Sequence, residues 1–139
     1  HCVALGLSVW LRLTITRFNY EEIPAILRLT EAEKIDRICL YHLAYSGRGT
    51  QLTEDDLSHA ESREAIDVIM ARALDYSKRG LYKDIVTVDN HCDGVYMYLK
   101  MKRENPERAE EVRKLLEWNG GMMGPEVGKF LLHPGHSIR

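Results

Sequence analysis

The sequence has few cysteines, and the three that it has are far apart. Cys2, Cys39 and Cys92 form no Cys-x-x-Cys pair, so neither a zinc ribbon nor a redox-active dithiol is indicated. An odd number of widely spaced cysteines is also unlike a secreted domain that disulfides hold together. We therefore expect a protein of the reducing cytoplasm, with no metal ligands of its own in this chain.

Long apolar runs and an excess of basic charge are missing as well. No run of about 18 apolar residues occurs, so no membrane span is predicted. A net charge of −2 argues against a nucleic-acid partner, because such proteins need a basic surface. The 139 residues, 45% hydrophobic and 29% charged, are typical of one soluble globular domain. The chain begins at His1 without a signal-peptide pattern, and we expect it to be a piece of a longer polypeptide.

Strand-like and helical segments alternate along the chain. The hydrophobic patterns predict strands at 11–16, 37–44 and 84–89, and helices near 21–34, 59–79 and 95–118. This order with short connections predicts an α/β fold in which the three strands are parallel neighbours in chain order and the helices cover one side. A closed barrel needs about eight strands. We therefore expect three consecutive βα units, a fragment of a barrel-like fold with an open edge.

Three helix starts carry sequence signals. Asn19 with Glu22 and Ser58 with Glu61 have the spacing of a capping box. Asn105 before Pro106 predicts a fresh helix start inside the last helical region, with proline in the first turn.

Polar residues gather toward the carboxyl ends of the predicted strands, where parallel α/β folds build their sites. Alternation places Arg12, Thr14 and Thr16 on one face of the first strand, Thr87 and Asp89 on one face of the third, and Tyr41 and His42 at the end of the second. Such a polar face predicts a lumen that holds a ligand. The alternative is that these groups satisfy one another in an ordinary core or line a solvated rim.

The loops after the second and third strands add candidate residues. The stretch 46–49, Ser-Gly-Arg-Gly, is typical of a backbone nest whose Arg48 binds a carboxylate or phosphate, although a structural turn fits equally. The triplet 89–91 brings together a base, an amide and an imidazole, Asp89, Asn90 and His91. Asp89 has a second interpretation as a helix cap. For His42 we expect either Asp89, a backbone carbonyl or a substrate as its partner.

Four segments together resemble one known family. They are Leu-Thr-Ile-Thr-Arg-Phe-Asn-Tyr (13–20), Cys-Leu-Tyr-His-Leu-Ala-Tyr-Ser-Gly-Arg-Gly (39–49), Val-Thr-Val-Asp-Asn-His-Cys-Asp-Gly-Val-Tyr (86–96) and Pro-Glu-Arg-Ala-Glu-Glu-Val-Arg-Lys-Leu-Leu-Glu-Trp-Asn-Gly-Gly (106–121). The family is the radical S-adenosylmethionine enzymes of the alternative heme pathway. The resemblance covers roughly residues 2–121 and is most specific at 41–49. The remaining residues, 122–139, depart from the family as an irregular tail.

The resemblance implies a partial (β/α)6 TIM-like barrel of which residues 1–121 are the second half. It implies S-adenosylmethionine and a 4Fe–4S cluster as cofactors, and the cluster-binding Cys-x-x-x-Cys-x-x-Cys motif is absent from this chain. The implied substrate is an iron tetrapyrrole that loses acetate side chains, didecarboxysiroheme giving an iron coproporphyrin. An electron donor such as ferredoxin or flavodoxin would be a partner, with no nucleic acid and no membrane.

The resemblance also implies roles for individual residues. Thr14, Thr16 and Arg17 would contact S-adenosylmethionine. His42 and Tyr41 would be catalytic residues at the substrate, and the residues that bind it would be Tyr45, Arg48, Asp89, Asn90 and His91.

Two other functions remain open at the level of sequence. One is a peptide-modifying enzyme of the same superfamily, which would hold a peptide in the lumen. The other is a non-catalytic α/β interaction domain, which would be favoured if Arg12, Thr14, His42 and Asp89 pointed away from one another.

Overall fold

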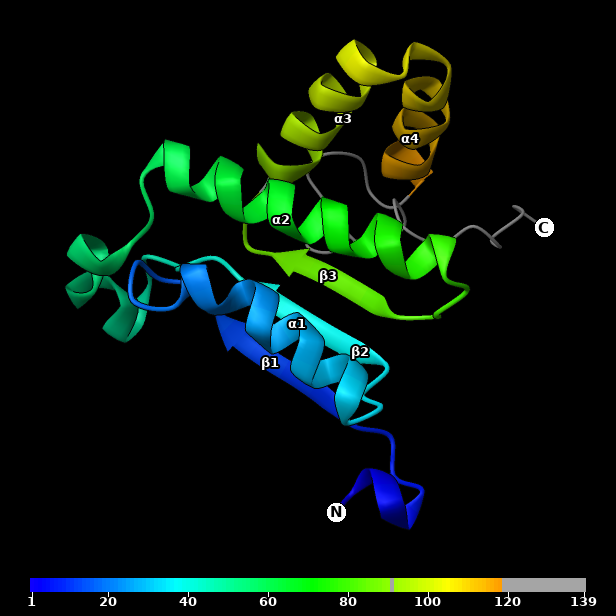
Figure 1. The fold of residues 1–139 in the computed structure, drawn as a ribbon. Helices are drawn as coiled ribbons and strands as arrows, with labels where there is room; N and C mark the ends of the chain where they lie inside the picture. The colour runs from blue at the N-terminus through cyan, green and yellow to red at the C-terminus, as the bar shows by residue number, and fades with distance from the viewer. Residues whose placement is uncertain (91, 119–139) are drawn as a thin grey trace.

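The computed structural model describes residues 1–90 and 92–118; for Arg48 and residues 115–118 it describes the backbone alone. Its centre is a three-stranded sheet of β1 (Trp10–Thr14), β2 (Arg37–Tyr41) and β3 (Asp84–Val88). The strands lie in the order β1-β2-β3 and both pairs are parallel (Figure 1). The predicted sheet is therefore confirmed, and each strand ends earlier than predicted.

The helices lie on one side of this sheet. They are α1 (Ile23–Ala32), α2 (His59–Lys78), α3 (Cys92–Glu104) and α4 (Pro106–Trp118). Figure 1 shows α1 and α2 along the same face of the sheet, with α3 and α4 packed as a pair beyond α2. The predicted helical region 95–118 is thus two helices. Its first helix begins before Val95, at Cys92.

The predicted helix starts have different outcomes. Ser58 and Glu61 form the capping box of α2, with each side chain bonded to the other's backbone N–H. Asn105 caps α4, because its Oδ1 accepts a hydrogen bond from the N–H of Arg108 at 3.1 Å. The prediction of a capping box at Asn19 is wrong. Its amide instead accepts from the N–H of Thr16 and donates to the carbonyl of Thr14, which closes the turn that ends β1.

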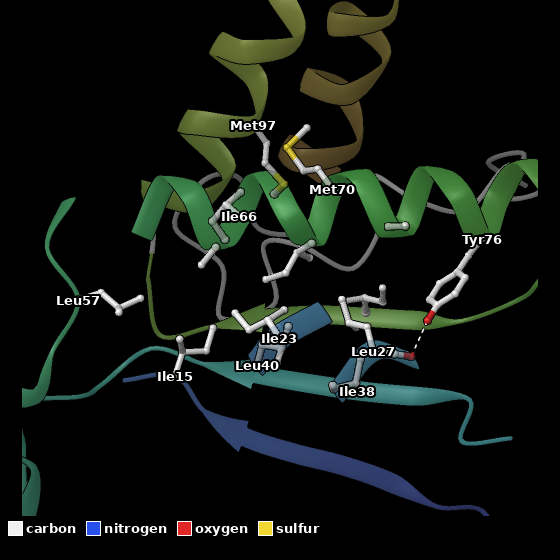
Figure 2. Close-up of a cluster of buried hydrophobic side chains, with 14 of the residues drawn as sticks. Ile15, Ile23, Leu27, Ile38, Leu40, Leu57, Ile66, Met70, Tyr76 and Met97 are labelled. Carbon is white, nitrogen blue, oxygen red and sulfur yellow. Dashed lines mark hydrogen bonds between the residues drawn. The ribbon is translucent and has the colours of Figure 1, made fainter. Parts of the chain in front are cut away.

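The hydrophobic core lies between the sheet and the helices α1 and α2 (Figure 2). Leu27 of α1, Leu40 of β2 and Ile66 of α2 are buried there, and burying each such side chain stabilises the fold by about 1.5–3 kcal/mol. Tyr76 of α2 joins the helices, because its hydroxyl donates a hydrogen bond of 2.6 Å to the carbonyl of Leu27.

Strand register decides which residues share a face. Leu13, Leu40 and Thr87 are paired neighbours across the sheet, and they lie on the face that α1 and α2 cover. Thr87 is 3% exposed and its hydroxyl lacks a hydrogen-bond partner among the described residues. The prediction that Thr87 shares a polar lumen face with the first strand is therefore wrong. Alternation separates two faces without saying which one the helices cover.

The opposite face of the sheet has no helix of the described residues against it (Figure 1). We call it the helix-free face. It carries Trp10, Arg12 and Thr14 of β1, Arg37, Cys39 and Tyr41 of β2, and Asp84, Val86 and Val88 of β3. The side chains along β1 are exposed, whereas Cys39 and Val86 are buried. Exposure on this face therefore increases toward the edge strand β1.

Candidate functional site

A cleft of about 520 Å³ opens at the carboxyl ends of β2 and β3. The loops that follow these strands and the first turns of α2 and α3 form its walls. Its polar lining comprises His42, Tyr45, Asp56, His59, Ser62, Arg63, Asp89, Asn90, Asp93 and Tyr96. The cleft therefore lies at the end of the sheet where parallel α/β enzymes place their sites.

A buried imidazole–carboxylate pair lines this cleft. Nε2 of His42 lies 2.8 Å from Oδ2 of Asp93, and the side chains are 8% and 3% exposed. The backbone of His42 is fixed as well, because its N–H donates to the carbonyl of Val88 at 2.9 Å. Both the neighbouring strand β3 and the start of α3 thus determine where the ring lies.

The turn after β3 brings Asp93 to this position. Asp89 adopts a left-handed backbone conformation with φ of +68°, which non-glycine residues rarely adopt. Asn90 follows, and its Oδ1 accepts a hydrogen bond from the N–H of Cys92 at 3.0 Å. This bond caps the early start of α3, which places Asp93 in the first helical turn opposite His42. Strain of this kind is often found at functional sites.

Tyr45 and Asp56 form a second polar pair in the cleft. The hydroxyl of Tyr45 donates a hydrogen bond to Oδ2 of Asp56, whose Oδ1 accepts from the N–H of Leu57 at 2.8 Å. The hydrogen bond to Asp56 raises the pKa of Tyr45 above its ordinary value, with smaller effects from burial and from the carboxylate charge. Tyr45 therefore stays a neutral hydroxyl group at the cleft.

The Gly-Arg-Gly stretch has a structural explanation. Residues Gly47–Gln51 form a 3-10 helix rather than a nest, and Gly47 has a φ of +56°. A Cβ on Gly49 would collide with the backbone carbonyl oxygen of Ala44. Both glycines are thus required by the turn. The side chain of Arg48 and the whole of His91 lie outside the described residues, so their predicted roles stay predictions.

The helix-free face presents a second group of polar residues. The guanidinium of Arg12 lies over the ring of Tyr41, 5.7 Å from its centroid, and that of Arg37 lies 4.4 Å from the centroid of Trp10. Arg37 also pairs with Asp84 at 3.3 Å. No carboxylate of the described residues pairs with Arg12, which is exposed. This cation is therefore available to a ligand.

The loop after β1 holds the residues predicted to contact S-adenosylmethionine. Thr14 is exposed at the end of β1, Thr16 is half-buried and Arg17 is exposed. Asn19 braces the backbone of this loop as described above, and the N–H of Arg17 donates to the carbonyl of Asp55 at 3.0 Å. The loop is therefore held in a fixed conformation next to the loop that follows β2.

The predicted site residues thus fall into two groups. Arg12, Thr14 and Tyr41 belong to the helix-free face, whereas His42 and Asp89 belong to the cleft. At the level of sequence, such a separation favours a non-catalytic interaction domain. The geometry by itself therefore supports that alternative, and the case for an enzyme comes from the comparisons below. Asp89 is also not the partner of His42. Sequence reasoning missed Asp93, for which the Asn90 cap was the available signal.

The three cysteines do not fit an iron–sulfur cluster. Cys2 precedes the first 3-10 helix, Cys39 is buried in β2 and Cys92 is exposed at the start of α3. The described residues contain no group of three or more His, Cys, Asp or Glu side chains that could hold a metal ion. In the same residues no helix is long and apolar enough to cross a membrane.

Three parallel βα units with polar residues at the carboxyl ends of the strands define a segment of an α/β protein. Comparison with known proteins shows which proteins this segment is similar to. The chain is 50% identical over 121 residues, 87% of its length, to Fe-coproporphyrin III synthase of Methanosarcina barkeri. It is 39% identical over 133 residues, 93% of its length, to pre-heme d1 synthase of Dinoroseobacter shibae.

These identities confirm the resemblance that the motifs indicated. The chain is homologous to a segment of the radical S-adenosylmethionine enzymes of heme biosynthesis. It spans about a third of the length of these curated relatives, 30% of the first and 33% of the second. No protein-family model matches the chain, and no solved structure matches it.

Proposed function

We propose that this chain is part of a radical S-adenosylmethionine enzyme that removes acetate side chains from an iron tetrapyrrole, didecarboxysiroheme giving an iron coproporphyrin. The 50% identity to Fe-coproporphyrin III synthase over 87% of the chain carries this proposal. The 39% identity to pre-heme d1 synthase supports it from a second heme-related enzyme.

The chemistry of the helix-free face agrees with a tetrapyrrole substrate. A modified siroheme is a flat ring system with several carboxylate side chains. The accessible guanidinium of Arg12 suits one of these carboxylates. The half-buried ring of Tyr41 beside it offers a surface for the macrocycle. In this proposal the substrate lies along the helix-free face and reaches over the end of β2 to His42.

The remaining residues have roles at the rim of this face. Thr14 and Thr16 have hydroxyl groups for the ribose of S-adenosylmethionine, and Arg17 has a guanidinium for its carboxylate. Substrate contacts are assigned to Tyr45, Arg48, Asp89, Asn90 and His91 on the loops after β2 and β3. These assignments come from the family resemblance and from the position of the residues at the strand ends.

The cofactors supply a carbon-centred radical when they are bound. Because the cysteines of this chain do not fit a cluster, no step of the reaction is assigned to them. We propose that the ligands of the 4Fe–4S cluster come from other residues of the intact protein, and that ferredoxin or flavodoxin delivers the electron.

Product analysis tests this proposal. The intact protein, isolated without oxygen, is incubated with S-adenosylmethionine, a reductant and didecarboxysiroheme, and products are identified by liquid chromatography and mass spectrometry. We expect 5′-deoxyadenosine together with a tetrapyrrole that has lost its acetate groups. Cofactor cleavage with an unchanged tetrapyrrole would point to a peptide-modifying enzyme. A cluster-loaded protein that cleaves no cofactor would favour an interaction domain.

A further inference from the structure

The pair of His42 and Asp93 leaves one ring nitrogen of the histidine for a ligand. An ionised carboxylate only accepts hydrogen bonds, so the contact of 2.8 Å assigns the proton to Nε2 of His42. In the neutral imidazole the other nitrogen, Nδ1, then has a lone pair. Within the described part of the chain no group is hydrogen-bonded to Nδ1. Among the described residues, the lone pair of Nδ1 is therefore free to bind a ligand such as a metal ion.

Both members of the pair line the cleft of about 520 Å³. Asp93, on the first turn of α3, is 3% exposed, and His42 is 8% exposed. A cleft of this size is within the range of small-molecule sites, about 300–1,000 Å³. The carboxylate holds the ring in one orientation, and the cleft has room for a ligand beside it.

This arrangement is the usual environment of a metal-binding histidine. Such a histidine almost always donates its second ring N–H to a carboxylate or a carbonyl, which fixes the tautomer and makes the ligating nitrogen more basic. The described residues offer too few further ligands to hold a metal ion by themselves. A single histidine suits instead an axial position on an iron that a macrocycle already holds.

We propose that His42 binds the iron of the tetrapyrrole through Nδ1 and that Asp93 is the positioning residue that orients its ring. This inference rests on the proposed function, because it takes the iron from that substrate. It adds the atom through which the substrate is recognised and a residue, Asp93, whose role the sequence did not indicate.

Other side chains of the cleft are less suited to this role. His59 also lines the cleft, but it is the exposed first residue of α2, and no described carboxylate orients its ring. The hydroxyl of Tyr45 is already bonded to Asp56. His59 therefore provides a matched comparison for His42, with the same side chain in the same cleft but without the buried carboxylate.

Binding of two porphyrins to the intact protein separates iron ligation from other contacts. The probes are iron(III) coproporphyrin III and its metal-free form, titrated without oxygen, and the ligands of the iron are identified by EPR and resonance Raman spectroscopy. We expect a nitrogen ligand in the wild type. His42→Ala should lose it and bind the iron form at least about tenfold more weakly, and added imidazole should restore the spectrum. Affinity for the metal-free form should not change.

Asp93→Asn is the second variant, because it keeps the size of the side chain and an acceptor oxygen while it removes the charge. We expect iron-porphyrin affinity to fall about 10–100-fold and the iron–nitrogen vibration to shift, with metal-free affinity unchanged. Equal losses for both porphyrins would mean that the pair is only structural and would overturn the inference. Loss of the nitrogen ligand in His59→Ala, with the ligand kept in His42→Ala, would overturn it as well.

Failure of this inference is distinguishable from failure of the proposed function. A protein that converts the tetrapyrrole, but whose bound iron has the same spectrum with and without His42, refutes iron ligation and leaves the function in place. A wild-type protein that binds neither porphyrin contradicts both.

Discussion

Replacing Tyr76 with phenylalanine removes one hydrogen bond from the core and leaves the ring in place. Tyr76 is 2% exposed, and its hydroxyl donates to the carbonyl of Leu27 at 2.6 Å. The same carbonyl also accepts from the hydroxyl of Thr30 at 2.8 Å, so Tyr76→Phe leaves no unpaired acceptor. The expected cost is therefore that of one net hydrogen bond, about 1 kcal/mol, rather than the roughly 1–3 kcal/mol of an orphaned buried group.

Urea and thermal unfolding measure this effect. For a chain of this length, about 1 kcal/mol corresponds to a decrease in Tm of roughly 3–4 °C. Tyr98→Phe is the control, because Tyr98 is half-buried and the structure gives its hydroxyl no hydrogen bond among the described residues. An unchanged Tm for Tyr76→Phe, or a loss equal to that of Tyr98→Phe, would refute the claim that this bond joins α1 to α2.

The pH dependence of the same variant gives a second check. Burial, the largest effect, raises the pKa of Tyr76 above its ordinary value. The unfolded chain therefore ionises this tyrosine first, and the stability that the neutral hydroxyl provides is lost as the pH rises above about 10. The phenylalanine variant has no such group. The difference in the free energy of unfolding between wild type and variant should shrink in this pH range.

Three further predictions concern the turns, the cap of α2 and the cysteines. Gly49→Ala should lower Tm in thermal unfolding, because its Cβ would collide with the carbonyl of Ala44, and an unchanged Tm would contradict this. Ser58→Ala should cost about 1 kcal/mol in urea unfolding. Hydrogen bonds from the hydroxyl and the backbone N–H of Ser58 lower the pKa of Glu61. The part of the cost that comes from the hydroxyl acting on the ionised carboxylate should therefore be present near neutral pH and be lost as the pH falls through that lowered pKa, so an equal cost in acid would contradict this. The 139-residue chain by itself should bind no 4Fe–4S cluster after anaerobic reconstitution with iron and sulfide, and stoichiometric iron with cofactor cleavage would disprove this.

The alternation of strands and helices could be predicted from the sequence because its signals are local. Alternating apolar residues and short connections are enough to predict parallel strands in chain order. The capping boxes show where this kind of reasoning stops. Asn19 and Ser58 have the same spacing to a glutamate, but the amide of Asn19 is long enough to reach the backbone of Thr14 and Thr16 and is used there instead.

The candidate site was only partly predictable, because its key contact joins distant parts of the chain. His42 was identified from its place at a strand end, whereas Asp93 follows it by 51 residues. Their contact depends on α3 beginning at Cys92, which the cap by Asn90 determines. The face on which Thr87 lies depends likewise on where α1 and α2 pack, and strand alternation contains no information on that.

Titration of the intact protein with iron(III) coproporphyrin III tests most directly whether the tetrapyrrole lies on the helix-free face. The comparison is between wild type, Arg12→Gln and the control Arg113→Gln on α4, away from the sheet. Loss of a charged hydrogen bond to a carboxylate corresponds to about 1.5–3 kcal/mol, so Arg12→Gln should bind roughly 10- to 150-fold more weakly, while the control binds like the wild type. Wild-type affinity in Arg12→Gln would contradict the proposal that this face binds the substrate.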